Sequence, residues 1–257
     1  MNTDLQKAST WKRISAWLFD TILMVSVVVL FGYVLSGILN FDGYYGDLTT
    51  AYEKYETQFG IDFEISQEAY LAMDEAQRTA YDEAYNRAHE ALVADEGAMQ
   101  SYGMVINLAL LITSISILLG YLVMELLIPI LLKNGQTLGK KIFSIAVMRT
   151  DSIRLTPVQL FVRTVLGKYA VGTMIPVYVI LLLLLNTMGV IGLAIVAGLA
   201  IAQVICLIAG GEGRAIHDRL AGTVVVDISS QRIFKDSDDL IAYTKKVHAE
   251  QAKHREY

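Results

Sequence analysis

Long apolar stretches separated by polar segments predict that this chain crosses a membrane. A bilayer core about 30 Å thick is spanned by roughly 20 apolar helical residues. Residues 14–39 and 104–132 each meet this requirement, because only single acidic residues and a few small polar ones interrupt their apolar side chains. A cleaved signal peptide is the alternative for the first segment, but its apolar core would be only about 7–15 residues long. The two segments are therefore predicted to be the first two transmembrane helices.

The longest apolar stretch, Tyr169–Gly211, contains no charged residue over 43 positions. As a single helix it would extend roughly 65 Å, about twice the thickness of the bilayer core. Asn186–Gly189 is its only turn-like sequence. We therefore predict two further spans, at about residues 166–185 and 190–209, with Lys168 extending from the start of the first toward the membrane interface. An apolar fraction of 54% agrees with an all-α membrane protein of four transmembrane helices.

The distribution of charge predicts how these helices are oriented. Residues 133–168 contain seven basic residues and one acidic residue, whereas residues 40–103 contain fourteen acidic residues and three basic ones. Basic short loops stay on the cytoplasmic side. We therefore expect both termini and residues 133–168 in the cytoplasm, and residues 40–103 outside the plasma membrane. Residues 229–257 are predicted to be a charged cytoplasmic tail.

The acidic insert at 40–103 is predicted to be helical. Gly60 after Leu48–Phe59 is a typical helix stop, and Ser66 is a typical N-cap residue. Beyond it, apolar and aromatic residues recur at helical spacing as far as Leu92. The pattern predicts an extracytoplasmic helical hairpin. Its many tyrosines would either form an interface, for a membrane partner or a second copy of this chain, or pack the hairpin on itself.

Two short segments on the predicted cytoplasmic side favour a small antiparallel sheet. Ile142–Met148 is rich in β-branched residues and follows a polar, glycine-bearing turn at residues 135–141. Residues 223–228 form a second such run. Thr156-Pro157 is a typical helix start, from which an amphipathic stretch leads into the third span. The cytoplasmic face is therefore expected to be a folded structure.

Two carboxylates lie inside the predicted spans, and both fall toward the cytoplasmic side. Asp20 is in the first span and Glu125 is in the second. Acidic residues within a membrane are costly and usually face a partner or a water-filled cavity. Other charged residues border the same depth, namely Arg13, Arg163, His217 and Asp218. Asp20 and Glu125 are candidates for an ion path. The alternative is a buried ion-pair network of these charged residues that locks the helix ends to the sheet.

Three short motifs beside these spans resemble the RDD family of membrane proteins. The family's Arg-x-x-Ala-x-x-x-Asp pattern in the first span is matched by Arg13, Ala16 and Asp20. Its Gly-Gln-Thr-x-Gly-Lys stretch after the second span is matched by Gly135, Gln136, Thr137, Gly139 and Lys140. Its His-Asp-x-x-Ala-Gly-Thr stretch after the last span is matched by His217, Asp218, Ala221, Gly222 and Thr223. Arg163 also resembles the family's arginine before the third span.

The resemblance implies a membrane domain at residues 9–228, interrupted by an insert longer than the family's usual first loop. Some bacterial members are reported as sodium/proton antiporters, so the resemblance implies exchange of Na⁺ or K⁺ for H⁺, with Asp20 and Glu125 as alternating binding sites. The alternative is a non-transporting membrane scaffold or assembly factor whose Arg/Asp network is structural. The lipid bilayer is the expected environment. Nothing in the sequence indicates an enzyme, a cofactor, a metal site or a nucleic-acid partner.

Overall fold

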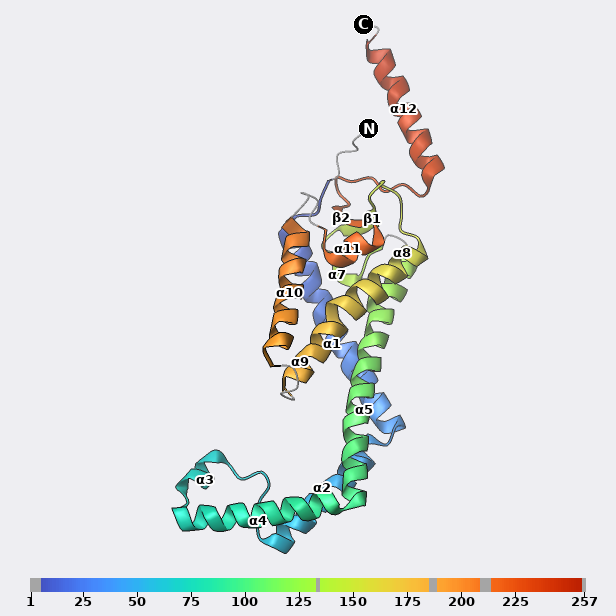
Figure 1. Cartoon of the computed structure of the whole chain (residues 1–257). Helices are drawn as coiled ribbons and strands as arrows, with labels where there is room; N and C mark the ends of the chain where they lie inside the picture. The colour runs from blue at the N-terminus through green and yellow to red at the C-terminus, as the bar shows by residue number, and fades with distance from the viewer. Residues whose placement is uncertain (1–5, 133–134, 185–188, 209–213, 256–257) are drawn as a thin grey trace. The chain divides into compact units, whose positions relative to one another are not determined.

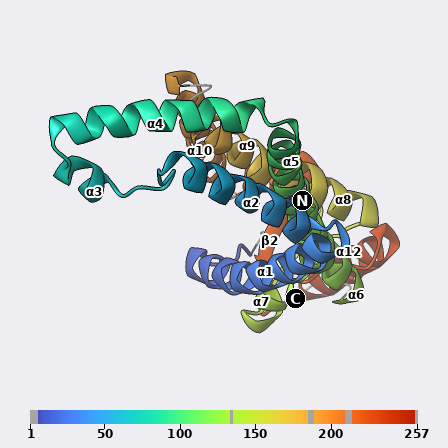
Figure 2. The same cartoon turned by 90° about the horizontal axis from the view of Figure 1, so that it is seen from below.

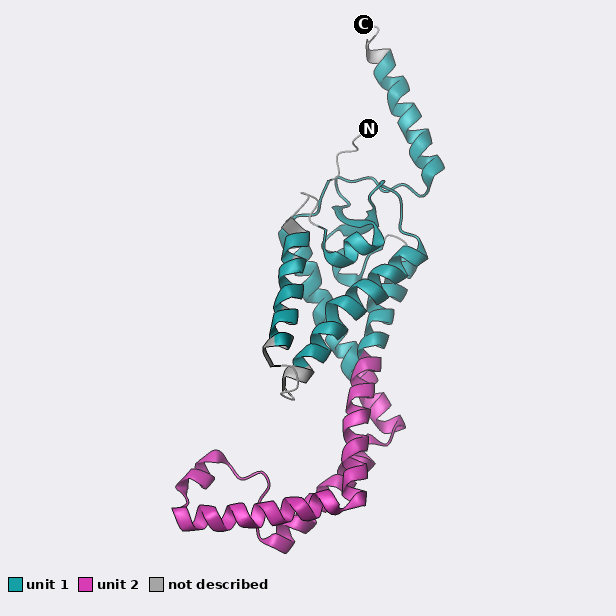
Figure 3. Ribbon diagram, viewed as in Figure 1, with its two compact units in different colours: residues 1–29, 117–257 teal, residues 30–116 magenta. Residues whose placement is uncertain are grey.

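The structure, a computed structural model, describes residues 6–132, 135–184, 189–208 and 214–255 (Figure 1). It is mostly helical, with one two-stranded sheet among the described residues. The chain divides into two compact units, one of residues 1–29 and 117–257 and the other of residues 30–116 (Figure 3).

Within the described residues, three helical stretches are long and apolar enough to cross a membrane. The first is α1 (Thr10–Ile38). The second, Glu96–Leu132, runs through α5 (Glu96–Tyr121), the π-helical η1 (Leu122–Leu127) and α6 (Ile128–Leu132). The third, Pro157–Ile180, runs through α8 (Pro157–Phe161), the π-helical η2 (Val162–Met174) and α9 (Ile175–Leu184). The first two predicted spans are thus found as apolar helices of spanning length.

The third helix begins at Pro157, as the Thr156-Pro157 start predicted, and the apolar stretch of spanning length begins before the predicted span boundary at residue 166. Thr156 accepts a hydrogen bond from the backbone of Gln159, and the Gln159 side chain bonds back to the cap residue. This capping box starts a helix that continues without a break into the apolar segment. The fourth predicted span falls on α10 (Gly189–Ile208), which contains a shorter apolar stretch, Leu193–Cys206, and lies beside α9. Gly189, the last residue of the predicted turn, is the first residue of α10, and residues 186–188 of that turn lie outside the described residues.

The predicted antiparallel sheet is confirmed. β1 (Ile145–Arg149) pairs with β2 (Thr223–Asp227), and Val147 lies opposite Val225. The first strand begins three residues later than predicted because residues Leu138–Ile142 form helix α7. The prediction of a turn was therefore wrong for the second half of residues 135–141.

The sheet is buried on both faces, and this fixes α1 against it. On one face Ile145, Val147 and Val225 pack with Ala16 of α1. On the other face Met148, Val224 and Val226 form a second cluster. The segment before α1 joins the same sheet, because the Ala8 amide donates a hydrogen bond to the Val225 carbonyl at 3.3 Å. Helices α7 and α11 (Ile216–Ala221) lie next to the sheet, and α12 (Ser237–Arg255) carries the charged tail (Figure 1).

The predicted helical insert is also confirmed. Helices α2 (Phe41–Phe59) and α4 (Glu75–Ala94) lie side by side, with the short α3 (Gln67–Ala72) between them in the chain (Figures 1 and 2). Gly60 ends α2 with a φ of 67°, and Ser66 caps α3 by accepting a hydrogen bond from the Ala69 amide.

The helix predicted after Ser66 is divided in two by Asp74. Its carboxylate accepts from the Gln77 amide, and the Gln77 side chain accepts from the Asp74 amide, which forms a second capping box. Aromatic rings pack on one another inside the insert, in the pairs Tyr52–Phe63, Phe63–Tyr85, Tyr70–Tyr81 and Tyr81–Tyr85. These tyrosines therefore pack the insert on itself.

Candidate functional site

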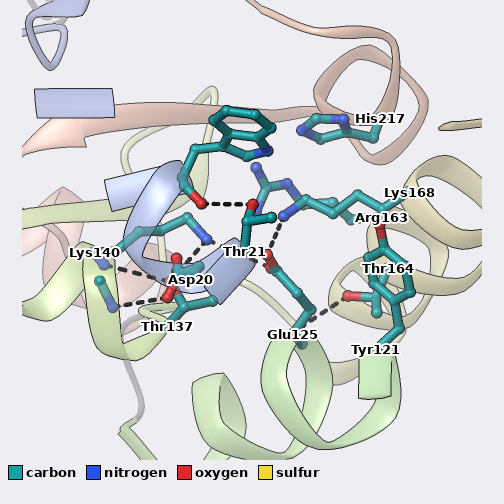
Figure 4. Close-up of polar contacts among 12 residues, drawn as sticks. Asp20, Thr21, Tyr121, Glu125, Thr137, Lys140, Arg163, Thr164, Lys168 and His217 are labelled. Carbon is teal, nitrogen blue, oxygen red and sulfur yellow. Dashed lines mark hydrogen bonds and ion pairs between the residues drawn. The ribbon is translucent and has the colours of Figure 1, made fainter. Parts of the chain in front are cut away.

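A cavity of about 730 Å³ lies among α1, η1, α7, η2 and α11, all within the larger unit. It is lined by ionisable residues of both signs, namely Arg13, Asp20, Glu125, Lys140, Arg163, Lys168, His217 and Asp218. All of these except Lys168 are candidate site or motif residues predicted from the sequence. Figure 4 shows Asp20 with Thr137 and Lys140 at one side and Glu125 with Lys168 and Arg163 at the other.

Glu125 lies between two lysines. The Lys140 ammonium is 3.5 Å from one carboxylate oxygen of Glu125, and the Lys168 ammonium contacts the other. All three side chains are largely buried, with 9% of Glu125, 10% of Lys140 and 15% of Lys168 exposed. Lys168 therefore points to an acidic partner inside the protein, and the prediction that it extends to the membrane interface was wrong.

The two π-helical segments bring Glu125 and Lys168 together. η1 contains Glu125, and η2 contains both Arg163 and Lys168. Arg163 and Lys168 are five residues apart, which is the interval of a π-helical hydrogen bond. The Thr164 hydroxyl of η2 donates a hydrogen bond to the Glu125 backbone carbonyl at 2.9 Å, and so joins the two segments directly.

Asp20 has a different environment, at the start of helix α7. Its carboxylate accepts a hydrogen bond from the Gly139 amide at 2.8 Å and another from the Thr137 hydroxyl. Thr137 also caps α7 by accepting from the Lys140 amide. A side chain at Gly139 would place its Cβ 2.4 Å from the Ala16 carbonyl oxygen, so only glycine permits this approach of α7 to α1. Asp20 and this motif glycine thus hold α7 against the first span.

Asp218 is the centre of a second buried network. The Arg163 guanidinium lies 2.8 Å from one carboxylate oxygen, and that of Arg13 lies 3.9 Å from the other. The Ala215 amide and the Thr223 hydroxyl also donate hydrogen bonds to the carboxylate, at 3.2 and 3.1 Å. Burial opposes ionisation, but the Arg163 guanidinium and the other donors hold the pKa of Asp218 well below its usual range.

His217 faces the cavity beside this network. Burial lowers the pKa of His217 to about 3, and the nearby Arg163 and Lys168 charges add to this effect while Asp218 opposes it. The imidazole is therefore neutral at pH 7, and its 3.7 Å approach to Asp218 is a polar contact between a neutral ring and a carboxylate.

The remaining motif residues shape the turns around the cavity. Gly135 has a φ of 61°, and the Gln136 side chain donates a hydrogen bond to the Ile145 carbonyl at 2.9 Å. Gly222 ends α11 with a φ of 65°, and Thr223 then begins β2. These residues connect helices α7 and α11 to the sheet.

Sequence reasoning missed Lys168 and Thr164 as members of the site. The available signal was a single lysine between the Pro157 helix start and a long uncharged run, on the same helix as Arg163. Within the described ranges, no group of three or more His, Cys, Asp or Glu side chains is arranged to hold a metal ion.

Comparison with known proteins gives one match. The model of the RDD family matches residues 7–222, which is most of the chain, and the resemblance carried by the three motifs is thereby confirmed. A search of curated proteins and a search of solved structures each found no match.

Proposed function

Because the chain belongs to the RDD family, we propose that it exchanges a monovalent cation, Na⁺ or K⁺, for a proton across the plasma membrane. The observation that supports this proposal is the Glu125 carboxylate, which lies between two lysine ammonium groups on the wall of a large cavity. The proposal requires no covalent step and no cofactor.

In this mechanism a proton and a metal cation compete for the charge of Glu125. While Lys168 is protonated, its ammonium neutralises the carboxylate. A buried lysine can release its proton, and the carboxylate then attracts a cation from the cavity. One proton leaves the Lys168 Nζ and one cation arrives at Glu125, so the charge at the site is unchanged. Lys140 faces the same carboxylate, at 3.5 Å.

Asp20 has a separate part in the proposal. Its two carboxylate oxygens already accept hydrogen bonds from α7, which favours a role in positioning Lys140 of that helix. This revises the hypothesis that Asp20 and Glu125 bind the cation in turn.

We also propose four transmembrane crossings with both termini in the cytoplasm. β1 precedes the third apolar helix and β2 follows α10, yet the two strands are hydrogen-bonded to each other. The chain must therefore cross the membrane an even number of times between residues 149 and 223. A crossing by η2 and α9 then requires a return by α10. The basic residues of the segment 133–168 favour the cytoplasm for this side.

Ion flux through the full-length protein tests the mechanism. The purified protein is reconstituted in vesicles that contain a pH-sensitive dye, and a Na⁺ or K⁺ gradient is imposed. We expect Glu125→Gln and Lys168→Arg each to lower proton flux by at least about tenfold, because arginine stays charged and cannot release a proton. Lys141→Arg is the matched control, since Lys141 is exposed on α7 next to Lys140, and it should keep wild-type flux.

Two outcomes would contradict the proposal. Wild-type flux in Lys168→Arg would exclude proton release from this lysine. Folded wild-type protein without any flux would favour the alternative function, a non-transporting scaffold in which both charged networks are structural. Thermal unfolding of each variant in detergent verifies that it is folded.

A further inference from the structure

The cavity beside Glu125 carries more positive than negative charge. Four side chains on its wall are cationic, namely Arg13, Lys140, Arg163 and Lys168. Three are carboxylates, namely Asp20, Glu125 and Asp218. His217 is neutral at pH 7, so the described residues of the wall carry a formal charge of +1.

The excess lies around two of the three carboxylates, Asp218 and Glu125. Asp20 is bound by the Gly139 amide and the Thr137 hydroxyl of α7. The four cations therefore share the two other carboxylates, with Arg13 and Arg163 at Asp218, and Lys140 and Lys168 at Glu125. Each carboxylate is thus faced by two cations. A buried surplus of positive charge is costly unless an anion compensates it.

Part of the wall is apolar and belongs to α1. Ile14, Trp17 and Met24 line the cavity there. Trp17 is 63% exposed and Ile14 is 45% exposed, so this part of the cavity is open on a helix that would face lipid. Arg13 lies in the first turns of α1, three residues after Thr10. In a membrane-spanning helix this end lies at the interface, at the level of the lipid headgroups, where tryptophan side chains are also common. The cavity therefore offers cations to a headgroup and an apolar surface to acyl chains.

We propose that this cavity binds the phosphate group of an anionic phospholipid from the leaflet on the side of the β-sheet. A single negative charge neutralises the wall, and the acyl chains lie against Ile14 and Trp17. A zwitterionic lipid brings no net charge and places its own ammonium near the arginines, so it binds more weakly. Free phosphate has the charge but no acyl chain to cover the apolar part.

Binding is measured by calorimetric titration of the full-length protein in nonionic detergent. The probes are short-chain phosphatidylglycerol, short-chain phosphatidylcholine and inorganic phosphate, all at constant ionic strength. We expect phosphatidylglycerol to bind at least about tenfold more tightly than either of the others. The titration uses no cation gradient, so its result is independent of whether the protein exchanges cations.

Variants of Ile14 test the site without breaking an ion pair. Ile14→Glu places a negative charge in the cavity and should weaken phosphatidylglycerol binding by about tenfold or more. Ile14→Gln adds no charge but removes apolar contact with the acyl chains, so it should weaken binding less than Ile14→Glu does. Thr10→Glu and Thr10→Gln form a second pair at the cavity, in the first turn of α1, where an acidic residue favours the helix and folding is retained.

The outcomes are distinct. Selective binding of phosphatidylglycerol that is lost in both Glu variants and kept in Thr10→Gln supports the proposal. Equal binding of phosphatidylcholine, or equal binding by the Glu and Gln variants, overturns it. Inorganic phosphate that binds as tightly as phosphatidylglycerol overturns the lipid as the occupant and points to a soluble phosphate.

Discussion

His217 is held between two elements of the membrane domain. A side chain at Gly167 of η2 would place its Cβ 2.5 Å from the Cβ of His217, so η2 and α11 meet at this point. The imidazole is 20% exposed and is surrounded by Arg163, Lys168, Glu125 and Asp218. This environment gives a histidine that remains neutral far below the pH at which the unfolded chain would protonate it.

The lowered pKa of His217 predicts an acid-sensitive stability. The folded pKa of about 3 lies below the usual value of 6.5, so the unfolded state binds the proton first. The stability that the neutral His217 contributes is fully present above pH 6.5. It is lost as the pH falls toward 3, by at most about 1.4 kcal/mol per pH unit for one proton. We expect the Tm of the wild type in detergent to fall between pH 7.5 and about 5, where carboxylates stay ionised, and His217→Gln to remove most of this dependence.

His248→Gln is the matched control, because His248 is exposed on α12. It should keep the pH dependence of the wild type. An equal dependence in His217→Gln would show that other groups are responsible.

At the level of single residues, the sequence indicated most of the charged side chains that line the cavity, but not Lys168 and not how the side chains pair. Arg13 and Asp20 share one face of α1, yet Arg13 contacts Asp218 and Asp20 binds α7. Such pairings depend on where α7 and α11 pack against α1. Helical spacing within one segment carries no information about those tertiary contacts.

Among the elements, the π-helical segments depend on a side chain as well as on backbone bonds. The Thr164 hydroxyl satisfies the Glu125 carbonyl, and Thr164 is only 1% exposed. Thr164→Val keeps the shape of the side chain and removes the donor. We expect a loss of about 1–3 kcal/mol in unfolding free energy, because a buried carbonyl is left without its partner. Denaturant unfolding in mixed micelles measures this loss.

Thr79→Val is the matched control for Thr164→Val. The Thr79 hydroxyl also donates to a helical carbonyl, that of Glu75, but on the exposed surface of α4 where water can replace it. A change of less than about 0.5 kcal/mol is expected there. Equal effects of the two substitutions would contradict a special role for Thr164.

Apolar periodicity and cap residues predicted most of the helices and strands. They did not predict where a helix is short, divided or π-helical. α7 was missed because two glycines in residues 135–139 favour a turn, whereas Thr137 and Asp20 together stabilise a short helix there. The division before α4 was visible as Asp74 followed three residues later by Gln77. The π-helices carry no period distinct from that of an α-helix over so few residues, and packing of η1 on η2 decides them.

For the whole molecule, the proposed four crossings predict which residues share a side of the membrane. In a Cys206→Ser background, single cysteines replace Glu68 in the insert, Thr150 after β1 and Ala242 in α12, all of which are exposed. We expect an impermeant maleimide to label Glu68→Cys in intact cells, and to label Thr150→Cys and Ala242→Cys only after permeabilisation. Labelling of Ala242→Cys together with Glu68→Cys would contradict the return of the chain by α10.

The positions along the chain of the segments that form the small sheet determine when this protein can finish folding. The segment before α1, β1 and β2 are hydrogen-bonded neighbours, although they come from the start, the middle and the late part of the chain. During synthesis, the strand Ile145–Arg149 therefore lacks its hydrogen-bonded partner until Thr223–Asp227 has left the ribosome. An uncovered apolar strand invites pairing with other chains. A nascent chain that stalls after α10 would thus have its apolar helices inserted and still present an aggregation-prone edge.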